Sequence, residues 1–162
     1  MNKVIDEKIK QKMDELRKLL PTERSLVIPL LHEVQNKEGW ISVEMMQEIA
    51  DYLKLHVGQV HEVATFYTMF NLEKKGTHHI EICTNISCYL NGAEKVMKCA
   101  ERRLGIKPGE TTRDGKFTLS EVECLAACGT GPVGTVHHEY IENLTEESIV
   151  SLIDRLENEG AH

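Results

Sequence analysis

The chain has 162 residues, with 19 lysines and arginines against 26 aspartates and glutamates, so its formal net charge is −7. The hydrophobic share of 41% is enough for a packed core, and the length suits one ordinary domain or two small ones. The acidic balance argues against a general nucleic-acid-binding protein, because such a protein needs a basic footprint.

The N-terminal residues do not have the pattern of a targeting segment. The run from Met1 to Glu7 turns acidic at once and has no apolar core, so we expect no secretory signal. No stretch approaches the about 18 continuous apolar residues of a membrane span, so we expect no membrane insertion. These features predict a cytoplasmic protein, in which clustered cysteines serve as metal ligands or catalytic thiols more often than as disulfides.

The first part of the chain has the periodicity of helices. Apolar residues recur at helical spacing, Pro21 ends the first run, and Pro29 should kink the second helix or reset its start. Ser42 is a good N-cap for the third helix. The predicted helices cover residues 5–20, 22–36, 42–53 and 57–70. Short helices joined by short turns predict a small bundle, followed by a linker over residues 73–76.

After Gly76 the pattern changes to strands and helices in alternation. One helix is predicted over 89–104, with Leu90 and Met97 on its apolar face, and another over 145–156 with Thr145 as its cap. Strands are predicted over 78–83, 117–124 and 132–137, and a fourth begins at residue 139. The order β-α-β-β-α fits a small thioredoxin-like α/β unit.

Four of the five cysteines form two close pairs, and each pair follows a strand-like run. Four residues separate Cys83 from Cys88, three separate Cys124 from Cys128, and 35 lie between the pairs. The end of a strand followed by a short loop can point thiolates at a common centre. Four thiolates are a full set of protein ligands for a [2Fe–2S] or [4Fe–4S] cluster, or for a structural zinc ion.

Other uses of these cysteines fit the spacing less well. Thiols that only fill a core would not need two close pairs beyond strands. Zinc sites more usually have two residues between paired cysteines, and a thioredoxin-type redox pair needs Cys-x-x-Cys, which is absent. A plant-type ferredoxin shares only the gap of four residues. A catalytic thiol would need a His, Asp or Asn partner, which the sequence does not place beside any cysteine.

The remaining candidates are interpreted as bystanders. In a continuous helix Cys99 lies roughly 16 Å along the axis from Cys88, too far for the same cluster. Neighbouring residues of a strand point to opposite faces, so neither His78-His79 nor His137-His138 makes a metal site alone. Gly129-Thr130-Gly131 does not open a helix and is rejected as a nucleotide site; its glycines should let the backbone approach a cluster and donate amides to its sulfurs.

Several stretches, together with the cysteines, resemble one protein family. They are Leu31–Gln35, Gly39–Ile41, Glu62–Phe70, Cys88–Gly92, Leu104–Ile106, Gly109–Thr112, Asp114–Phe117 and Val122–Gly129. In this order and with this cysteine spacing, the chain resembles the 24 kDa-type [2Fe–2S] subunit of NADH:quinone oxidoreductase (respiratory complex I). The same subunit type occurs in NAD-linked hydrogenases and formate dehydrogenases. The chain departs from the family at Ala126, where glycine is frequent, and at Gly131-Pro132, where Ala-Pro is frequent.

The resemblance implies an α+β fold, with an N-terminal helical bundle over residues 1–75 and a thioredoxin-like [2Fe–2S] domain over residues 76–162. It implies that Cys83, Cys88, Cys124 and Cys128 bind one [2Fe–2S] cluster. The chain would then be an electron-transfer subunit of an oxidoreductase, with no catalytic residue of its own.

The resemblance also implies a partner. FMN and NADH would bind a 51 kDa-type flavoprotein subunit, and the absence of a dinucleotide fingerprint in this sequence fits that division. The N-terminal bundle is the expected docking element, because cluster ligation does not need it. The parent complex stays open: it could be a respiratory enzyme, a hydrogenase or a formate dehydrogenase. In a respiratory enzyme, the peripheral arm would bring the chain to a membrane. A zinc-stabilised interaction module and a free-standing ferredoxin-like shuttle are the rival classes.

Overall fold

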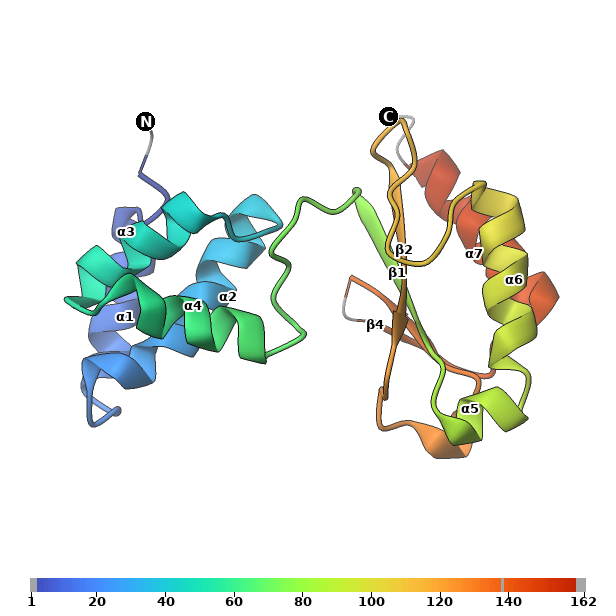
Figure 1. The fold of residues 1–162 in the computed structure, drawn as a ribbon, viewed down its shortest axis with the longest axis horizontal. Helices are drawn as coiled ribbons and strands as arrows, with labels where there is room; N and C mark the ends of the chain where they lie inside the picture. Colours follow the sequence, from blue (N-terminus) through green and yellow to red (C-terminus); the bar gives the residue numbers. More distant parts are fainter. Residues whose placement is uncertain (1–2, 138, 160–162) are drawn as a thin grey trace. The chain divides into compact units, whose positions relative to one another are not determined.

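The computed structural model describes residues 3–137 and 139–159, and the chain divides into two compact units, Met1–Lys74 and Lys75–His162 (Figure 1). Each unit has a hydrophobic core of its own, which is the requirement for a separate domain. Within the described residues, no helix is both long and apolar enough to cross a membrane.

The first unit is helical, as predicted. Its elements are α1 (Glu7–Arg17), η1 (Glu23–Leu26), α2 (Val27–Glu38), α3 (Val43–Leu53) and α4 (Val57–Phe66). Ser42 caps α3 by accepting a hydrogen bond from the Met45 amide at 3.2 Å, which confirms its predicted role. Pro29 lies in the first turn of α2, where a missing N–H is tolerated, so it resets the start of the helix rather than kinking it.

The prediction that the fourth helix extends to Phe70 is wrong, because α4 ends at Phe66. The cause is the buried side chain of Gln35. Its amide donates a 2.8 Å hydrogen bond to the carbonyl of Met69 and accepts one of 2.6 Å from the amide of Asn71. These bonds hold the segment out of the helix, and Tyr67, which lies in it, is 38% exposed.

The second unit contains a sheet with the strand order β2-β1-β3-β4. The strands are β1 (His78–Cys83), β2 (Phe117–Val122), β3 (Gly134–Val136) and β4 (Glu139–Ile141). β1 pairs with β2 in parallel and with β3 in antiparallel, and β3 pairs with β4 in antiparallel. The predicted bounds of β1 are confirmed, whereas β2 and β3 are shorter than the predicted 117–124 and 132–137 because their ends belong to loops.

The prediction of one helix over 89–104 is also wrong. Two helices, α5 (Ile86–Leu90) and α6 (Ala93–Leu104), meet at Gly92, whose φ of +98° is accessible to glycine at little cost and breaks the helix. Leu90, predicted to face the core, is 75% exposed as a result. The last helix is α7 (Glu146–Glu159), and α6 and α7 lie side by side over one face of the sheet (Figure 1).

The two faces of the sheet differ in polarity. The face below α6 and α7 buries Ile80, Ile82 and Leu119 in the core of the unit. The opposite face carries polar pairs, such as the Thr135 hydroxyl, which donates to the Glu81 carboxylate at 2.9 Å. This alternation is typical of a sheet with one packed face.

The histidines near the sheet make a contact that the sequence did not predict. Nδ1 of His78 lies 3.0 Å from Nε2 of His137, across β1 and the end of β3. His79 forms a separate hydrogen bond of 2.8 Å with the Ser120 hydroxyl. His138 lies outside the described residues.

Candidate iron–sulfur site

Both cysteine pairs lie at the same end of the sheet, where the parallel strands β1 and β2 end. β1 and β2 run parallel and end together, since Cys83, the last residue of β1, is opposite Val122, the last residue of β2. Cys88 lies in α5, which directly follows β1. Cys124 lies in the loop after β2, and Cys128 begins the short helix η2 (Cys128–Thr130). Figure 1 shows α5 and the segment after β2 at the same end of the unit.

Several contacts connect the two pairs. Cys83 and Cys128 both lie near enough to Cys88 to contribute, after burial, to a raised pKa of its thiol. The Cys83 thiol donates a long hydrogen bond of 3.9 Å to the carbonyl of Glu123, next to Cys124. The segment that carries Cys124 and Cys128 therefore lies beside the first pair.

The two pairs differ in their surroundings. Cys83 and Cys88 are 3% and 1% exposed and pack with Ala93 and Val133, whereas Cys124 and Cys128 are exposed. Burial raises the pKa of the Cys88 thiol, and the nearby Cys83 adds to the rise, against a hydrogen bond from the Val133 backbone. A metal that binds Cys88 must therefore displace a proton from a thiol that ionises reluctantly.

The backbone of Gly131 lies close to the sulfur of Cys88. A Cβ atom at Gly131 would lie 3.1 Å from the Cys88 sulfur, so glycine allows the close approach that was expected of it. No atom lies within 4 Å of the corresponding position at Gly129. In the segment after β2, the Ala126 amide donates a hydrogen bond to the Cys124 sulfur at 3.3 Å.

Ala126 adopts an unusual backbone conformation to make this bond. Its φ of +57° lies in the left-handed region, which L-residues other than Gly, Asn and Asp rarely occupy. Glycine, which the resemblance leads us to expect here, would adopt this positive φ at little cost. The methyl group of Ala126 adds strain without displacing the neighbouring cysteine.

The donor set fits a [2Fe–2S] cluster. In the ranges 3–137 and 139–159, no three Cys, His, Asp or Glu side chains are gathered closely enough to hold a single metal ion. A [2Fe–2S] cluster needs two protein ligands on each of two irons, because bridging sulfides complete the coordination. Two pairs of thiols match this requirement, one from the end of β1 and α5 against an apolar wall, the other from the segment after β2 and open to solvent.

Two features near the site were missed or misplaced by the sequence patterns. The Tyr140 hydroxyl, from β4, donates a 3.0 Å hydrogen bond to the Leu125 carbonyl and so fixes the loop between Cys124 and Cys128. No local sequence signal connects these residues, because their contact depends on the pairing of β3 with β4. Cys99 lies in α6, and its thiol donates a hydrogen bond to the Glu146 carbonyl at 3.5 Å. Its separation from Cys88 was predicted for one continuous helix, but that helix is broken at Gly92.

Comparisons with known proteins identify the family of the chain. A family model described as thioredoxin-like [2Fe-2S] ferredoxin matches residues 9–157. The chain is 42% identical to a subunit of the NADH-quinone oxidoreductase of Rickettsia conorii, over 98% of this chain and 96% of that protein. It is 41% identical to the mitochondrial NADH dehydrogenase [ubiquinone] flavoprotein 2 of Dictyostelium discoideum, over 83% of this chain and 55% of that protein.

A solved structure extends the comparison to the fold. A chain of an NAD+-reducing [NiFe]-hydrogenase in the H2-reduced state superposes with a TM-score of 0.73 at 16% identity, over 82% of this chain and 22% of that chain. The predicted α+β fold and the predicted relationship are both confirmed. The family match covers the bundle, the sheet and all four paired cysteines, and the chain belongs to the thioredoxin-like [2Fe-2S] ferredoxin family.

Proposed function

We propose that this chain is an electron-carrying subunit of an NADH-oxidising complex, in which Cys83, Cys88, Cys124 and Cys128 hold one [2Fe–2S] cluster. The proposal rests on one observation in a member of this ferredoxin family: both cysteine pairs lie where the parallel strands β1 and β2 end. When bound, the cluster supplies one-electron chemistry, so that electrons taken up in pairs by a flavin are passed on singly.

The chain's own residues have distinct tasks in this proposal. The four thiolates bind the irons, and Ala93 and Val133 keep water from the side of Cys83 and Cys88. The exposed Cys124 and Cys128 leave one edge of the site open to a partner. The Ala126 amide, which donates to the Cys124 sulfur, stabilises negative charge there. With cysteine ligands alone, we expect a low reduction potential, roughly −400 mV as in plant-type ferredoxins.

The relatives support a place in a respiratory NADH dehydrogenase. The Rickettsia conorii relative, whose name makes it a subunit of NADH-quinone oxidoreductase, aligns over 96% of its own length. We infer that this chain likewise acts as an oxidoreductase subunit in a peripheral arm, without a catalytic residue of its own. FMN and NADH bind a separate 51 kDa-type flavoprotein, which exchanges single electrons with the cluster.

A subunit of an NAD-linked hydrogenase or formate dehydrogenase is the second candidate. It has the support of the fold shared with the NAD+-reducing hydrogenase chain. The identity of 42% to the Rickettsia protein, against 16% to the hydrogenase chain, favours the quinone oxidoreductase.

Iron and acid-labile sulfide analysis of the purified chain, with EPR before and after dithionite, tests the proposal. We expect about two irons and two sulfides per chain, no EPR signal when oxidised, and an S = 1/2 signal when reduced. Zinc in place of iron, in protein purified without air, would make the chain a structural module and contradict the electron-carrier function.

The role of the N-terminal unit can be tested by truncation. A chain of residues 76–162 keeps the second core and all four paired cysteines, so it should retain the EPR signal. We propose that the bundle provides most of the affinity for the flavoprotein, so the truncated chain should bind the purified flavoprotein subunit far more weakly than the full chain. Equal binding would show that docking does not need the bundle.

A further inference from the structure

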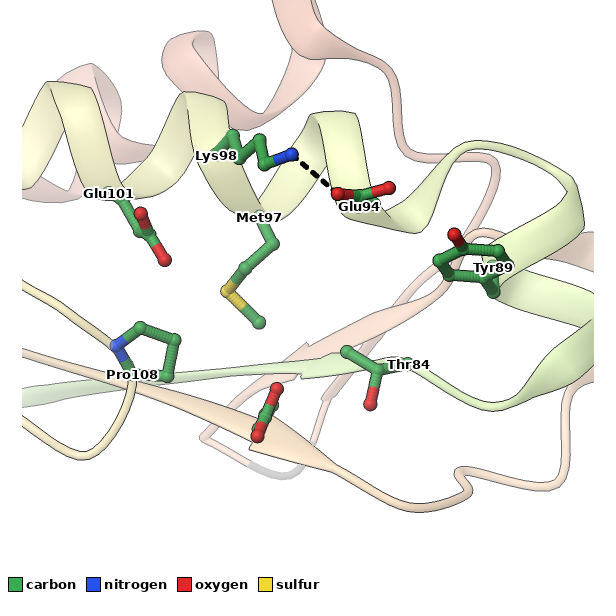
Figure 2. Close-up of a pocket in the computed structure, with 8 residues that line it drawn as sticks. Thr84, Tyr89, Glu94, Met97, Lys98, Glu101 and Pro108 are labelled. Carbon is green, nitrogen blue, oxygen red and sulfur yellow. Dashed lines mark hydrogen bonds and ion pairs between the residues drawn. The ribbon is translucent and has the colours of Figure 1, made fainter.

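A pocket of about 330 Å³ lies beside the cysteine site in the second unit. Figure 2 shows it between α6 and the strands, with Met97 reaching from the helix toward Pro108 and the strands. Two of its lining residues are neighbours of candidate ligands, since Thr84 follows Cys83 and Tyr89 follows Cys88. The pocket therefore lies in the same part of the unit as the candidate ligands Cys83 and Cys88.

The polar lining of the pocket is mainly anionic. Glu94 and Glu101 on α6 and Glu121 on β2 face it, together with one ammonium group, that of Lys98. Lys98 is paired with Glu94, and Glu101 binds Lys107 at 2.9 Å. The side chain of Glu121 is exposed and forms no hydrogen bond or ion pair with any residue in the described part of the chain, so its carboxylate is available to a ligand.

The rest of the lining gives the pocket its shape and distinguishes it from a solvated acidic surface. Met97 and Pro108 provide apolar walls, and the Tyr89 ring lies at one end (Figure 2). Its volume is at the lower end of the range for ligand pockets, about 300–1,000 Å³, which suits one long side chain better than a nucleotide. Apolar walls match the methylene stem of a basic side chain, and the carboxylates match its charged end.

The chemistry of the lining favours arginine. A guanidinium group can donate two parallel hydrogen bonds to a carboxylate such as Glu121, and it stacks on aromatic rings such as Tyr89. A lysine ammonium, a compact and strongly hydrated charge, would use the aromatic end of the pocket less well.

The surface next to the pocket is apolar, which points to a protein ligand. On α5, Ile86, Tyr89 and Leu90 are 65%, 53% and 75% exposed, and Ile86 and Leu90 lie one helical turn apart on the same side. A free small cation needs no apolar neighbour, whereas protein interfaces combine an apolar centre with a polar rim. Tyr89 belongs both to this apolar surface and to the pocket.

We propose that the pocket receives an arginine side chain of the flavoprotein partner, while Ile86, Tyr89 and Leu90 form the apolar part of the same contact. This inference rests on the proposed function, because it assigns the arginine to the flavoprotein. It adds a second docking element, on the cluster-bearing unit, to the one proposed for the bundle. The arginine would then bring the surface of the flavoprotein against the segments that carry the four cysteines.

The methionine distribution provides a direct test of the pocket. Met97 is the only methionine after Met69, so in the cluster-loaded full chain labelled with 13C at the methionine methyl groups it reports on the pocket alone. Nα-acetyl-arginine methylamide should shift the Met97 methyl signal in a saturable way and leave the other signals unchanged. Glu121→Gln should weaken this response by about fivefold, the size of an exposed ion pair. Glu139→Gln, at an exposed glutamate of β4, should not.

Three results of that titration would overturn the pocket assignment. They are an unmoved Met97 signal, the same response to neutral Nα-acetyl-norleucine methylamide, and equal behaviour of the two glutamate variants. Spermidine that binds more tightly than the arginine probe would also overturn it, because the pocket would then be a site for free polyamines.

The docking role is tested with the purified flavoprotein subunit. Glu121→Arg should reduce the affinity of the full, cluster-loaded chain for it by about tenfold or more, since it places like charges together at the contact, whereas Glu139→Arg should have no effect. Equal affinities of the two variants would contradict the docking role. Iron, sulfide and EPR measured on the same samples separate failure of the docking inference from failure of the proposed function. If the cluster is intact and Glu121→Arg has no effect on affinity, only the docking inference fails. If the wild-type chain has no cluster, the proposed function fails.

Discussion

The two cysteine pairs lie at the same end of the sheet but are held by different kinds of structure. Cys83 and Cys88 are buried, and they belong to regular elements, the end of β1 and the helix α5. Cys124 and Cys128 are exposed, in a loop fixed by the Tyr140 hydroxyl and by a strained residue, Ala126. Core packing positions the first pair, whereas a few individual contacts position the second.

This difference separates the stability of the unit from the binding of the cluster. The buried pair contributes to both, because its sulfurs fill the small core with Ala93 and Val133. The exposed pair should contribute to cluster binding alone. Substitutions in the two pairs should therefore have the same effect on the cluster and different effects on the cluster-free protein.

The largest effect is expected from replacing the cysteines one at a time with serine. Each of Cys83→Ser, Cys88→Ser, Cys124→Ser and Cys128→Ser should remove most of the bound iron, measured as iron and sulfide per chain. In the cluster-free chain, Cys88→Ser buries a hydroxyl and should lower the free energy of unfolding by about 1–3 kcal/mol in urea titrations. Cys124→Ser, at an exposed position, should change it by less than about 0.5 kcal/mol.

Cys99 provides the control for this series. Cys99→Ser should leave the iron content unchanged, because its thiol contacts the backbone of α7 at Glu146 and not the other cysteines. Iron loss confined to the Cys99 variant would overturn the ligand assignment. Equal destabilisation by Cys88→Ser and Cys124→Ser would remove the contrast between the buried and the exposed pair.

The sequence predicted the structure around Cys83 and Cys88 better than the structure around Cys124 and Cys128. The strand predicted over 78–83 is observed as β1, and the sequence placed each pair at the end of a strand-like run. The break between α5 and α6 was missed, although Asn91-Gly92 is a turn signal, because a helical apolar pattern continues through it. The end of α4 depends on the distant side chain of Gln35, which local periodicity does not reveal.

The same limit applies to the site. Spacing identified four candidate ligands, but their burial depends on how α5 and the loop after β2 pack together. Tyr140 reaches Leu125 only through the register of β3 and β4, in which Thr135 is opposite Tyr140. Local patterns therefore suggest which residues are candidate ligands, whereas the contacts that hold the exposed loop come from pairing between distant segments.

Removing one of these contacts should loosen the exposed pair alone. Tyr140→Phe deletes the hydroxyl that donates to the Leu125 carbonyl and should lower the free energy of unfolding by about 1 kcal/mol, the usual net value of a hydrogen bond. In the cluster-free chain, Cys124 and Cys128 should then react faster with a thiol reagent, while Cys83 and Cys88 react as before. Tyr67→Phe, at a partly exposed tyrosine of the first unit, is the matched control. Faster reaction of all four thiols would mean that Tyr140 supports the whole unit.

The smallest effect should come from relieving the strain at Ala126. A positive φ costs an L-residue about 1–2 kcal/mol, and the greater freedom of glycine in the unfolded chain offsets part of that gain. Ala126→Gly should therefore raise the free energy of unfolding by about 0.5 kcal/mol and keep the amide that donates to the Cys124 sulfur. Ala127→Gly, at a residue with a negative φ of −115°, should instead be neutral or destabilising. An unchanged reduction potential in the Ala126 variant would show that the loop already holds this amide in place, and a loss of stability would show that the left-handed conformation is not strained.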